Sequence, residues 1–294
     1  MTLSADLPLI VEEACARAGL DPSMATPIRM GENFIYRVGD AVVRIGRVGQ
    51  GTVAAREVAV SGWLAQRGVP AVEALNDIDQ PVLINGRPVT YWRLLPEHRQ
   101  GRPGEIGSLL KRLHSQRVPE EIGLAPLNPF VRLPERISAA STLSPDDRAF
   151  LADHLEALRA AWGHLPEDEP CVVHGDAWAG NVVVALGETS AFFVDLERFS
   201  IGSPAWDLVS TAIKLTSFAW ISPEDYAEFC KAYGQDVTAW DGFEVMRDVR
   251  ELRMTCYLAQ HASEHPDARS EAQLRVDCLR DKSGARPWRW SPLS

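Results

Sequence analysis

The 294-residue sequence lacks the features typical of disulfide-bonded, zinc-binding and membrane-spanning proteins. Its five cysteines are odd in number, far apart and without a Cys-x-x-Cys pair, so they indicate neither a disulfide framework nor a zinc site. The N-terminus has no basic segment followed by an apolar core, and no apolar run approaches the ~18 residues of a membrane span. We therefore expect a cytoplasmic protein that binds no membrane.

Internal repeats and low-complexity tracts are also missing, and the composition is that of an ordinary globular protein. Apolar residues make up 46% and charged residues 24% of the chain, which argues against disorder. The net charge of −10 argues against general binding to nucleic acid or to anionic membranes. It is compatible with a cationic small-molecule partner, although solubility alone explains it equally well.

The first third of the chain has the pattern of a small antiparallel sheet with two helices. Helical spacing is found at residues 9–18 and 54–66, and both helices end at glycine or proline. Short β-type runs occur between them and after them, joined by turns such as Gly39-Asp40 and Asn85-Gly86. The expected strands are 26–30, 34–38, 41–45, 81–84 and 87–93.

Beyond Pro96 the pattern changes from strand-rich to helix-rich. Serine and proline mark several of the helix starts, as in Ser144-Pro145, Ser203-Pro204 and Ser222-Pro223. The expected helices are 104–116, 144–162, 204–218, 223–233 and 240–262. The sequence therefore predicts an α+β protein with a small first domain, residues 1–95, and a larger, mainly helical second domain, residues 96–294.

The most informative stretch of the chain lies at residues 171–197. Two short apolar strands, 171–173 and 181–185, flank a loop that begins His174-Gly175-Asp176 and contains Gly180. A turn at 187–190 predicts a hairpin that returns the chain along 191–194 to Asp195. We therefore expect Asp176, Asn181 and Asp195 to converge.

These residue types suit phosphoryl transfer, which depends mostly on positioning and on electrostatic stabilisation. Asp176 can accept a proton from an attacking hydroxyl, while Asn181 and Asp195 offer oxygen ligands to Mg²⁺ that bridges nucleotide phosphates. The Asp-x₄-Asn spacing equals that of the protein-kinase catalytic loop. On the residues alone, Asp176 remains open to a second interpretation, in which it caps the loop through backbone amides.

The chain resembles the aminoglycoside phosphotransferase and choline kinase family, which has a protein-kinase-like fold. The resemblance rests on His174-Gly175-Asp176 with Asn181, on Val194-Asp195-Leu196-Glu197-Arg198, and on 201–208, with weaker matches in the first third. It implies a two-lobe fold with a small antiparallel-sheet N-lobe and a larger helical C-lobe. It also implies that Asp176 is the catalytic base and that Asn181 and Asp195 hold Mg²⁺, with Glu197 as a further acid near the metal.

The resemblance assigns nucleotide contacts to the first lobe. Arg44 stands in place of the usual phosphate-binding lysine, and we expect it to pair with Glu57. Asn33 belongs to the nucleotide-covering loop, 31–34, which has one glycine instead of three. Arg93 and Leu94 are the expected hinge residues, whose backbone binds adenine. The alternatives are a solvent-facing Arg44, an exposed Glu57 and an ordinary hairpin turn at 31–34.

Three further polar residues of the second lobe have structural interpretations. His174 is interpreted as a hydrogen-bonded organiser of the loop. Glu197 has a solvated strand-end position as its alternative to a metal role. Asp207 lies in an apolar stretch and is expected to hold the catalytic-loop backbone by hydrogen bonds.

The resulting hypothesis is a small-molecule kinase that uses ATP and Mg²⁺ to phosphorylate a hydroxyl. The first possibility for the acceptor is an antibiotic such as an aminoglycoside, which would make the protein an antibiotic-resistance enzyme. Choline, ethanolamine or sugar-type acceptors are the alternative, and a non-catalytic nucleotide-binding pseudokinase is the rival from another class. A cationic amine acceptor would need acidic side chains, for which the candidates are Asp207, Glu224, Asp225, Glu228, Asp248 and Glu251.

Overall fold

The structure is a computed structural model that describes residues 3–31, 33–166 and 168–292. The chain separates into two compact units. Unit 1 consists of Met1–Gly101, Gln116–Leu124 and Ala179–Phe199; unit 2 consists of Arg102–Ser115, Ala125–Trp178 and Ser200–Ser294. In the described residues, no helix is both long and apolar enough to cross a membrane.

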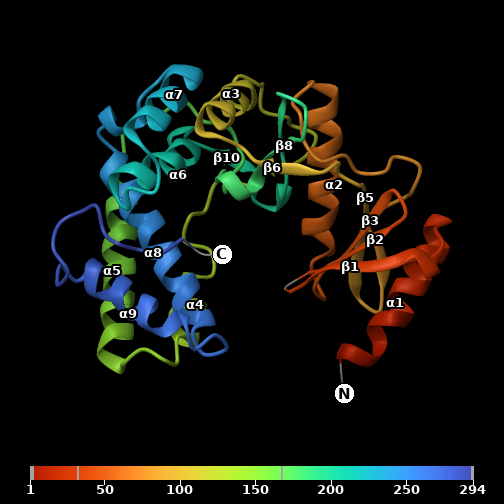
Figure 1. Cartoon of the computed structure of the whole chain (residues 1–294), viewed down its shortest axis with the longest axis horizontal. Helices are drawn as coiled ribbons and strands as arrows, with labels where there is room; N and C mark the ends of the chain where they lie inside the picture. Colours follow the sequence, from red (N-terminus) through yellow and green to blue (C-terminus); the bar gives the residue numbers. More distant parts are fainter. Residues whose placement is uncertain (1–2, 32, 167, 293–294) are drawn as a thin grey trace. The chain divides into compact units, whose positions relative to one another are not determined.

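Unit 1 combines a five-stranded antiparallel sheet, in the order β1-β2-β3-β5-β4, with a three-stranded sheet, in the order β6-β8-β9 (Figure 1). Short 3₁₀ turns connect several of these elements. The elements of unit 1 are α1 (Leu3–Ala18), β1 (Ala25–Met30), β2 (Phe34–Val38), β3 (Ala41–Ile45), α2 (Gly51–Gln66), β4 (Val82–Ile84), β5 (Arg87–Arg93), β6 (His98–Gln100), β8 (Val182–Ala185) and β9 (Ala191–Phe193).

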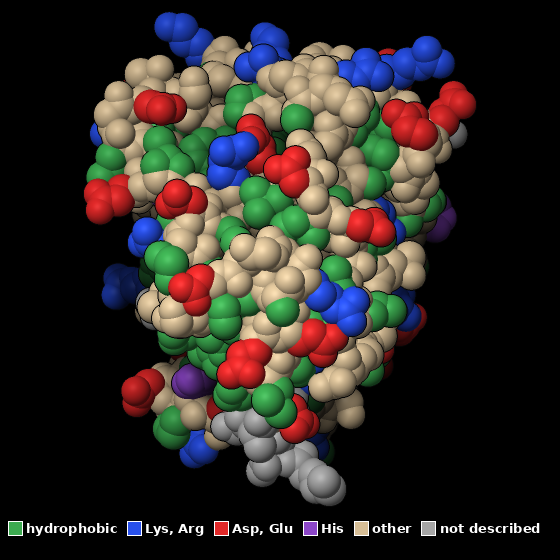
Figure 2. Space-filling model, turned by 90° about the vertical axis from the view of Figure 1, so that its right-hand side faces the viewer, with side chains coloured by type: hydrophobic (Ala, Val, Ile, Leu, Met, Phe, Trp, Pro, Cys, Tyr) green, Lys and Arg blue, Asp and Glu red, His purple; other side chains and the backbone are tan. Residues whose placement is uncertain are grey.

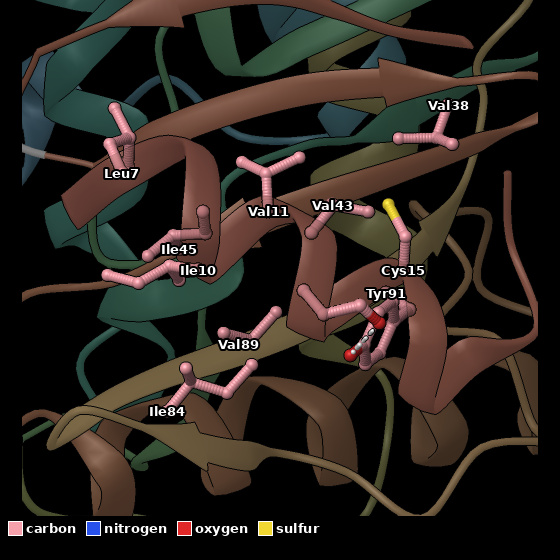
Figure 3. Packing of buried hydrophobic residues seen from close by; sticks show 11 residues of the cluster. Leu7, Ile10, Val11, Cys15, Val38, Val43, Ile45, Ile84, Val89 and Tyr91 are labelled. Carbon is pink, nitrogen blue, oxygen red and sulfur yellow. Dashed lines mark hydrogen bonds between the residues drawn. The ribbon is translucent and has the colours of Figure 1, made fainter. Parts of the chain in front are cut away.

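The core of the five-stranded sheet lies against α1. Val43 and Ile45 of β3, two residues apart, point toward the apolar face of α1, as do Val89 and Tyr91 of β5 (Figure 3). The Tyr91 hydroxyl donates to the Ala14 carbonyl at 2.9 Å. Each such side chain contributes about 1.5–3 kcal/mol when buried. Because strand side chains alternate between faces, the residues in between, including Arg44, point away from α1.

The hairpin β8–β9 belongs to unit 1, although residues 96–294 are expected to form the second domain. The Phe193 amide donates to the Pro70 carbonyl at 3.0 Å, and the Val72 amide donates to the Phe193 carbonyl at 2.8 Å. The segment after α2 thus extends the sheet at β9. Strand β7 (Cys171–Val173) lies in unit 2 instead, where it pairs with β10 (Ser200–Gly202).

Unit 2 is mainly helical, with β7 and β10 as a two-stranded sheet (Figure 1). Serine caps α5 and α7: the Asp147 amide donates to the Ser144 hydroxyl, and the Asp225 amide donates to the Ser222 hydroxyl. The helices are α3 (Pro103–His114), α4 (Leu133–Ala139), α5 (Pro145–Trp162), α6 (Ala205–Thr216), α7 (Pro223–Tyr233), α8 (Phe243–His261) and α9 (Ala268–Leu279). All helices and strands expected from the sequence are present, whereas α4, α9, β6 and β10 are additions.

The surface carries charges of both signs. Figure 2 shows one face of the molecule, on which acidic and basic side chains are interspersed among apolar and uncharged ones. Charge of this kind supports solubility without favouring one class of polyelectrolyte partner.

Lys214 on α6 is a partly buried lysine, and its ammonium makes no hydrogen bond or ion pair with the residues that the structure describes. Burial lowers its pKa from 10.5 to about 8. Below pH 8 the side chain is charged in the folded and unfolded states, and the full desolvation penalty acts on the fold. Above pH 10.5 it is neutral in both states, and the penalty vanishes.

Lys214→Met is therefore expected to raise the free energy of unfolding at pH 7 by roughly 2 kcal/mol. The gain should shrink as the pH rises from 8 to 10.5. Urea denaturation of both proteins at pH 7 and pH 10 measures it. Lys231→Met, at an exposed position of α7, is the matched control and should show no such change with pH. A destabilised Lys214→Met protein at pH 7 would contradict the interpretation.

Candidate functional site

An arginine–glutamate pair lies on the face of the sheet opposite α1. Arg44 of β3 donates through Nη1 to Glu57 Oε1 of α2 at 2.5 Å, and through Nη2 to Glu197 Oε2 at 3.3 Å. The Arg44 and Glu57 side chains are only 17% and 5% exposed. The expected ion pair is therefore present, and the solvent-facing alternatives for both residues are wrong.

The pair sits in a strongly coupled electrostatic environment. Burial raises the pKa of Glu57 to about 7, against the opposing charge and hydrogen bond of Arg44, and the charges of Asp195 and Glu197 raise it further. Burial would lower the pKa of Arg44, but the charges of Glu57, Asp195 and Glu197 outweigh it, so that the pKa of Arg44 is raised. One cation thus stands among three acids, and a divalent metal ion would balance the excess negative charge.

Asn33 approaches the same arginine. In the amide orientation that satisfies its neighbours, its side-chain oxygen accepts from Arg44 Nη2 at 2.8 Å and Nε at 3.3 Å. Asn33, Arg44, Glu57 and Glu197 line one pocket of unit 1. Glu32 of the predicted covering loop lies outside the described residues. Because the sequence of unit 1 contains no lysine, arginine is its main source of positive charge for binding phosphate.

The candidate metal ligands Asn181 and Asp195 lie at one end of the β8–β9 hairpin. Val182 pairs with Phe193, and the Val194 amide donates to the Asn181 carbonyl at 3.0 Å, which places Asn181 and Asp195 beside each other. Asn181 is buried, whereas Asp195 is exposed. Asp195 also has a φ of 58°, a left-handed backbone conformation that is uncommon outside glycine and often marks functional sites.

This donor set fits magnesium. Mg²⁺ takes one or two protein oxygen ligands and keeps water and phosphate oxygens at its other positions. Asn181 and Asp195 supply an amide and a carboxylate, and the exposure of Asp195 leaves space for the remaining ligands. The described residues contain no cluster of three or more His, Cys, Asp or Glu side chains suited to a metal. The pair therefore suits a metal that arrives with a nucleotide.

The loop that carries Asp176 lies in unit 2, where Asp207 of α6 holds its backbone. Asp207 Oδ2 accepts from the His174 amide at 2.7 Å, and Oδ1 accepts from the Gly175 amide at 2.9 Å. Asp207 is fully buried. Burial would raise its pKa, but the hydrogen bond and charge of His114, with the charges of His174 and Arg250, lower it below the ordinary value. The expected role of Asp207 in fixing the loop is present.

Asp176 itself is partly open to solvent, with a side chain 40% exposed. Its amide lies 3.3 Å from Nδ1 of His174, which is buried and organises the loop as expected. Its Oδ1 lies 3.5 Å from Nη1 of Arg250 on α8. Sequence reasoning missed Arg250, because no local pattern links residues 74 positions apart.

The expected hinge residues have no free main-chain donor. The Arg93 amide donates to the Glu73 carbonyl at 2.8 Å, and the Leu94 amide donates to the Asp40 carbonyl at 2.9 Å. The Arg93 side chain, 70% exposed, pairs with Glu73 at 3.0 Å. Neither N–H can therefore donate to adenine without breaking a bond within the protein, because the carbonyls of Glu73 and Asp40 already accept from both donors.

The acidic candidates for binding an amine acceptor are engaged or distributed over helix surfaces. Asp207 holds backbone amides, and Asp225 caps α7. Arg286 binds both Asp248, at 3.0 Å, and the buried Glu251, at 2.6 Å. The two others, Glu224 and Glu228, are exposed on α7. The expectation of an acidic acceptor site thus gains no support from these residues.

The model of the phosphotransferase enzyme family matches residues 25–248 of the chain. Solved structures with the same fold include the amicoumacin kinase hAmiN in complex with AMP-PNP, Ca²⁺ and Ami, with a TM-score of 0.70 at 13% identity, covering 93% of this chain and 96% of the other. A choline/ethanolamine kinase family protein from Mesorhizobium loti has a TM-score of 0.61 at 19% identity, covering 93% and 94%.

Spectinomycin phosphotransferase APH(9)-Ia, solved with ADP and spectinomycin, has a TM-score of 0.64 at 13% identity and covers 93% of both chains. The comparison with curated proteins gave no match. At these identities the structural likeness establishes the fold, which is the expected protein-kinase-like α+β fold.

Proposed function

Because the chain belongs to the phosphotransferase enzyme family, we propose that it is a small-molecule kinase that transfers the γ-phosphoryl group of ATP to a hydroxyl. One observation carries this proposal. In unit 1, Arg44 is bound to Glu57 and to Glu197. Glu197 follows Asp195 by two residues, and Asp195 lies beside Asn181. A phosphate-binding cation and the oxygen ligands for a divalent metal are thereby combined in one unit.

We assign the nucleotide to these residues of unit 1. Arg44 binds phosphate oxygens, and Glu57 holds its guanidinium in place, so that the charge is fixed before ATP arrives. Asn33 orients Arg44 from the covering loop. Asn181 and Asp195 would hold Mg²⁺, with Glu197 as a second acid near it. When bound, Mg²⁺ neutralises charge on the phosphates.

Asp176 is assigned as the general base. The acceptor hydroxyl gives its proton to the Asp176 carboxylate as its oxygen forms a bond to the γ-phosphorus. The bond from that phosphorus to the β–γ bridging oxygen breaks, and ADP leaves with the electron pair. The partial exposure of Asp176 permits access of an acceptor. An enzyme that consumes ATP works where ATP is abundant, which favours the cytoplasm.

The similar structures suggest two acceptor classes. Amicoumacin kinase and spectinomycin phosphotransferase are named for antibiotics, and others for choline. We favour a hydroxylated antibiotic, which would make the protein a resistance enzyme, because phosphotransferases named for several antibiotics, amicoumacin, spectinomycin and a macrolide, are similar to this chain in fold. Choline, ethanolamine and sugars form the second class.

A mass-spectrometric screen tests the proposal. The protein is incubated with ATP, Mg²⁺ and a panel of antibiotics, amino alcohols and sugars, and each acceptor is examined for the gain of one phosphoryl group. We expect transfer to at least one compound, abolished by a chelator of Mg²⁺. Tight Mg²⁺-dependent ATP binding with no transfer to any compound and no ATP consumption would instead favour a pseudokinase.

A further inference from the structure

Arg250 on α8 is a buried arginine with three defined contacts in unit 2. Its side chain is 7% exposed, and its Nη1 lies 3.5 Å from Asp176 Oδ1. Its Nη2 donates to the Trp206 carbonyl at 2.8 Å. Its guanidinium lies 3.8 Å from the centroid of the Trp206 ring, a cation–π contact. The guanidinium is thus fixed from two sides before it meets Asp176.

The same tryptophan fixes the loop that carries Asp176. The Trp206 indole donates to the Gly175 carbonyl at 2.9 Å, while the neighbouring Asp207 accepts from the His174 and Gly175 amides. The first turn of α6 therefore holds both the backbone that precedes Asp176 and the arginine that contacts its side chain. With the backbone fixed in this way, Arg250 acts on the orientation of the Asp176 side chain.

Arginine suits this position better than lysine. A planar guanidinium can stack on an indole, donate to a carbonyl and face a carboxylate at once, whereas an ammonium is a point charge. Burial lowers the pKa of Arg250, and the charges of Asp176 and Asp207 oppose that shift. A buried charge is costly unless it is compensated, and the carboxylates of Asp176 and Asp207 supply this compensation.

We propose that Arg250 is a positioning residue for the general base, which holds Oδ1 of Asp176 so that Oδ2 receives the proton of the acceptor hydroxyl. The inference rests on the proposed function. Arg250 itself exchanges no proton and touches no reacting atom; it acts through Asp176. The contact is an ion pair at 3.5 Å and not a short hydrogen bond, so it orients the carboxylate while leaving it able to accept the proton.

Arg250→Gln tests the inference. We expect kcat to fall by about 10- to 100-fold, the scale that follows from misplacement of a catalytic group, with the KM for ATP within about twofold of wild type. Arg250→Lys keeps the charge but cannot make all three contacts, so its kcat should fall by about 10-fold. In an Asp176→Asn background, Arg250→Gln should produce no further loss of kcat, because the group that it orients has been removed.

Arg275 of α9 offers a matched control. It is also buried, stacks on a tryptophan with 4.8 Å to the Trp290 centroid, pairs with Glu271 and donates to the Ser291 carbonyl. Arg275→Gln should lower the melting temperature while the folded enzyme retains wild-type kcat. This control separates the effect of losing the contact that orients Asp176 from the general effect of removing a buried arginine that stacks on a tryptophan.

Several results would overturn the inference. Wild-type kcat in folded Arg250→Gln or Arg250→Lys would do so, and so would a loss of equal factor in the Asp176→Asn background. If Arg250→Gln does not fold, as circular dichroism would reveal, Arg250→Lys decides by the same criterion. Absence of transfer by the wild-type enzyme would instead refute the proposed function, so the two failures are distinguishable.

Discussion

Asp176→Asn is expected to reduce kcat by about 1,000-fold, within the range attributed to a positioned general base and the electrostatics around it. Asparagine keeps the shape of the side chain and an oxygen for Arg250, but it cannot take the acceptor proton. Nucleotide binding should be nearly unchanged, because the residues assigned to ATP all belong to unit 1. Single-turnover kinetics with the acceptor found in the screen, together with calorimetric titration of AMP-PNP, measure the two effects.

The control for this prediction is stability. Asp176 is partly exposed, so neutralising it leaves solvent to compensate Arg250 in part, and the melting temperature should fall by only a few degrees. Asp168→Asn changes another acid of unit 2 and should leave kcat unaltered. Turnover of Asp176→Asn within tenfold of wild type would exclude Asp176 as the base.

Asp195→Asn is expected to raise the Mg²⁺ concentration that gives half-maximal turnover by about 10- to 100-fold, because the metal loses its charged protein ligand. The substitution isolates that charge. Asparagine tolerates the left-handed backbone conformation of residue 195 better than most residues do, so the φ of 58° should persist. Turnover measured over a Mg²⁺ series at saturating ATP gives the shift.

Glu188→Gln provides the matched control for Asp195→Asn. Glu188 lies in the turn between β8 and β9, at the other end of the same hairpin, and is exposed. Its loss should leave the Mg²⁺ dependence of wild type. An unshifted Mg²⁺ dependence in Asp195→Asn would remove this residue from the metal site and leave the assignment to Glu197 and Asn181.

Local patterns of the sequence predicted the features that depend on near neighbours. The strands at 41–45 and 87–93 and the helix at 54–66 were predicted from local patterns, whereas the Arg44–Glu57 pair that joins strand and helix was implied by the family resemblance. The turn after β8 likewise predicted the hairpin that returns the chain to Asp195. These features could be predicted because each depends on fewer than about fifteen consecutive residues.

Features that depend on distant segments could not be predicted in this way. Strand β10 has three residues and exists because it pairs with β7, almost thirty positions earlier. The donors of Arg93 and Leu94 are consumed by Glu73 and Asp40, which no periodicity links to them. Arg250 is indistinguishable in sequence from Arg247 and Arg253 of the same helix. Arg253 also lies over the Trp206 ring, at 5.9 Å, and Arg250 is set apart by its closer approach, 3.8 Å, and by its contact with Asp176.

Helix α9 was missed for a different reason. Its twelve residues, Ala268–Leu279, include four charged ones and show weak apolar periodicity, so the sequence gives little sign of a buried face. Arg275 explains part of the weak periodicity, because its charge predicts a solvent-exposed position whereas its side chain is buried. Its stacking on Trp290 and its pairing with Glu271 make the burial possible.

The most direct test of the account is the position of the metal in a crystal of the protein grown with AMP-PNP and Mn²⁺ in place of Mg²⁺. Anomalous scattering locates Mn²⁺ independently of the protein model. We predict a single strong peak at about 2.2 Å from side-chain oxygens of Asn181 and Asp195, with phosphate oxygens completing the coordination. A peak held by other residues, with Asn181 and Asp195 both free of metal, would contradict the account.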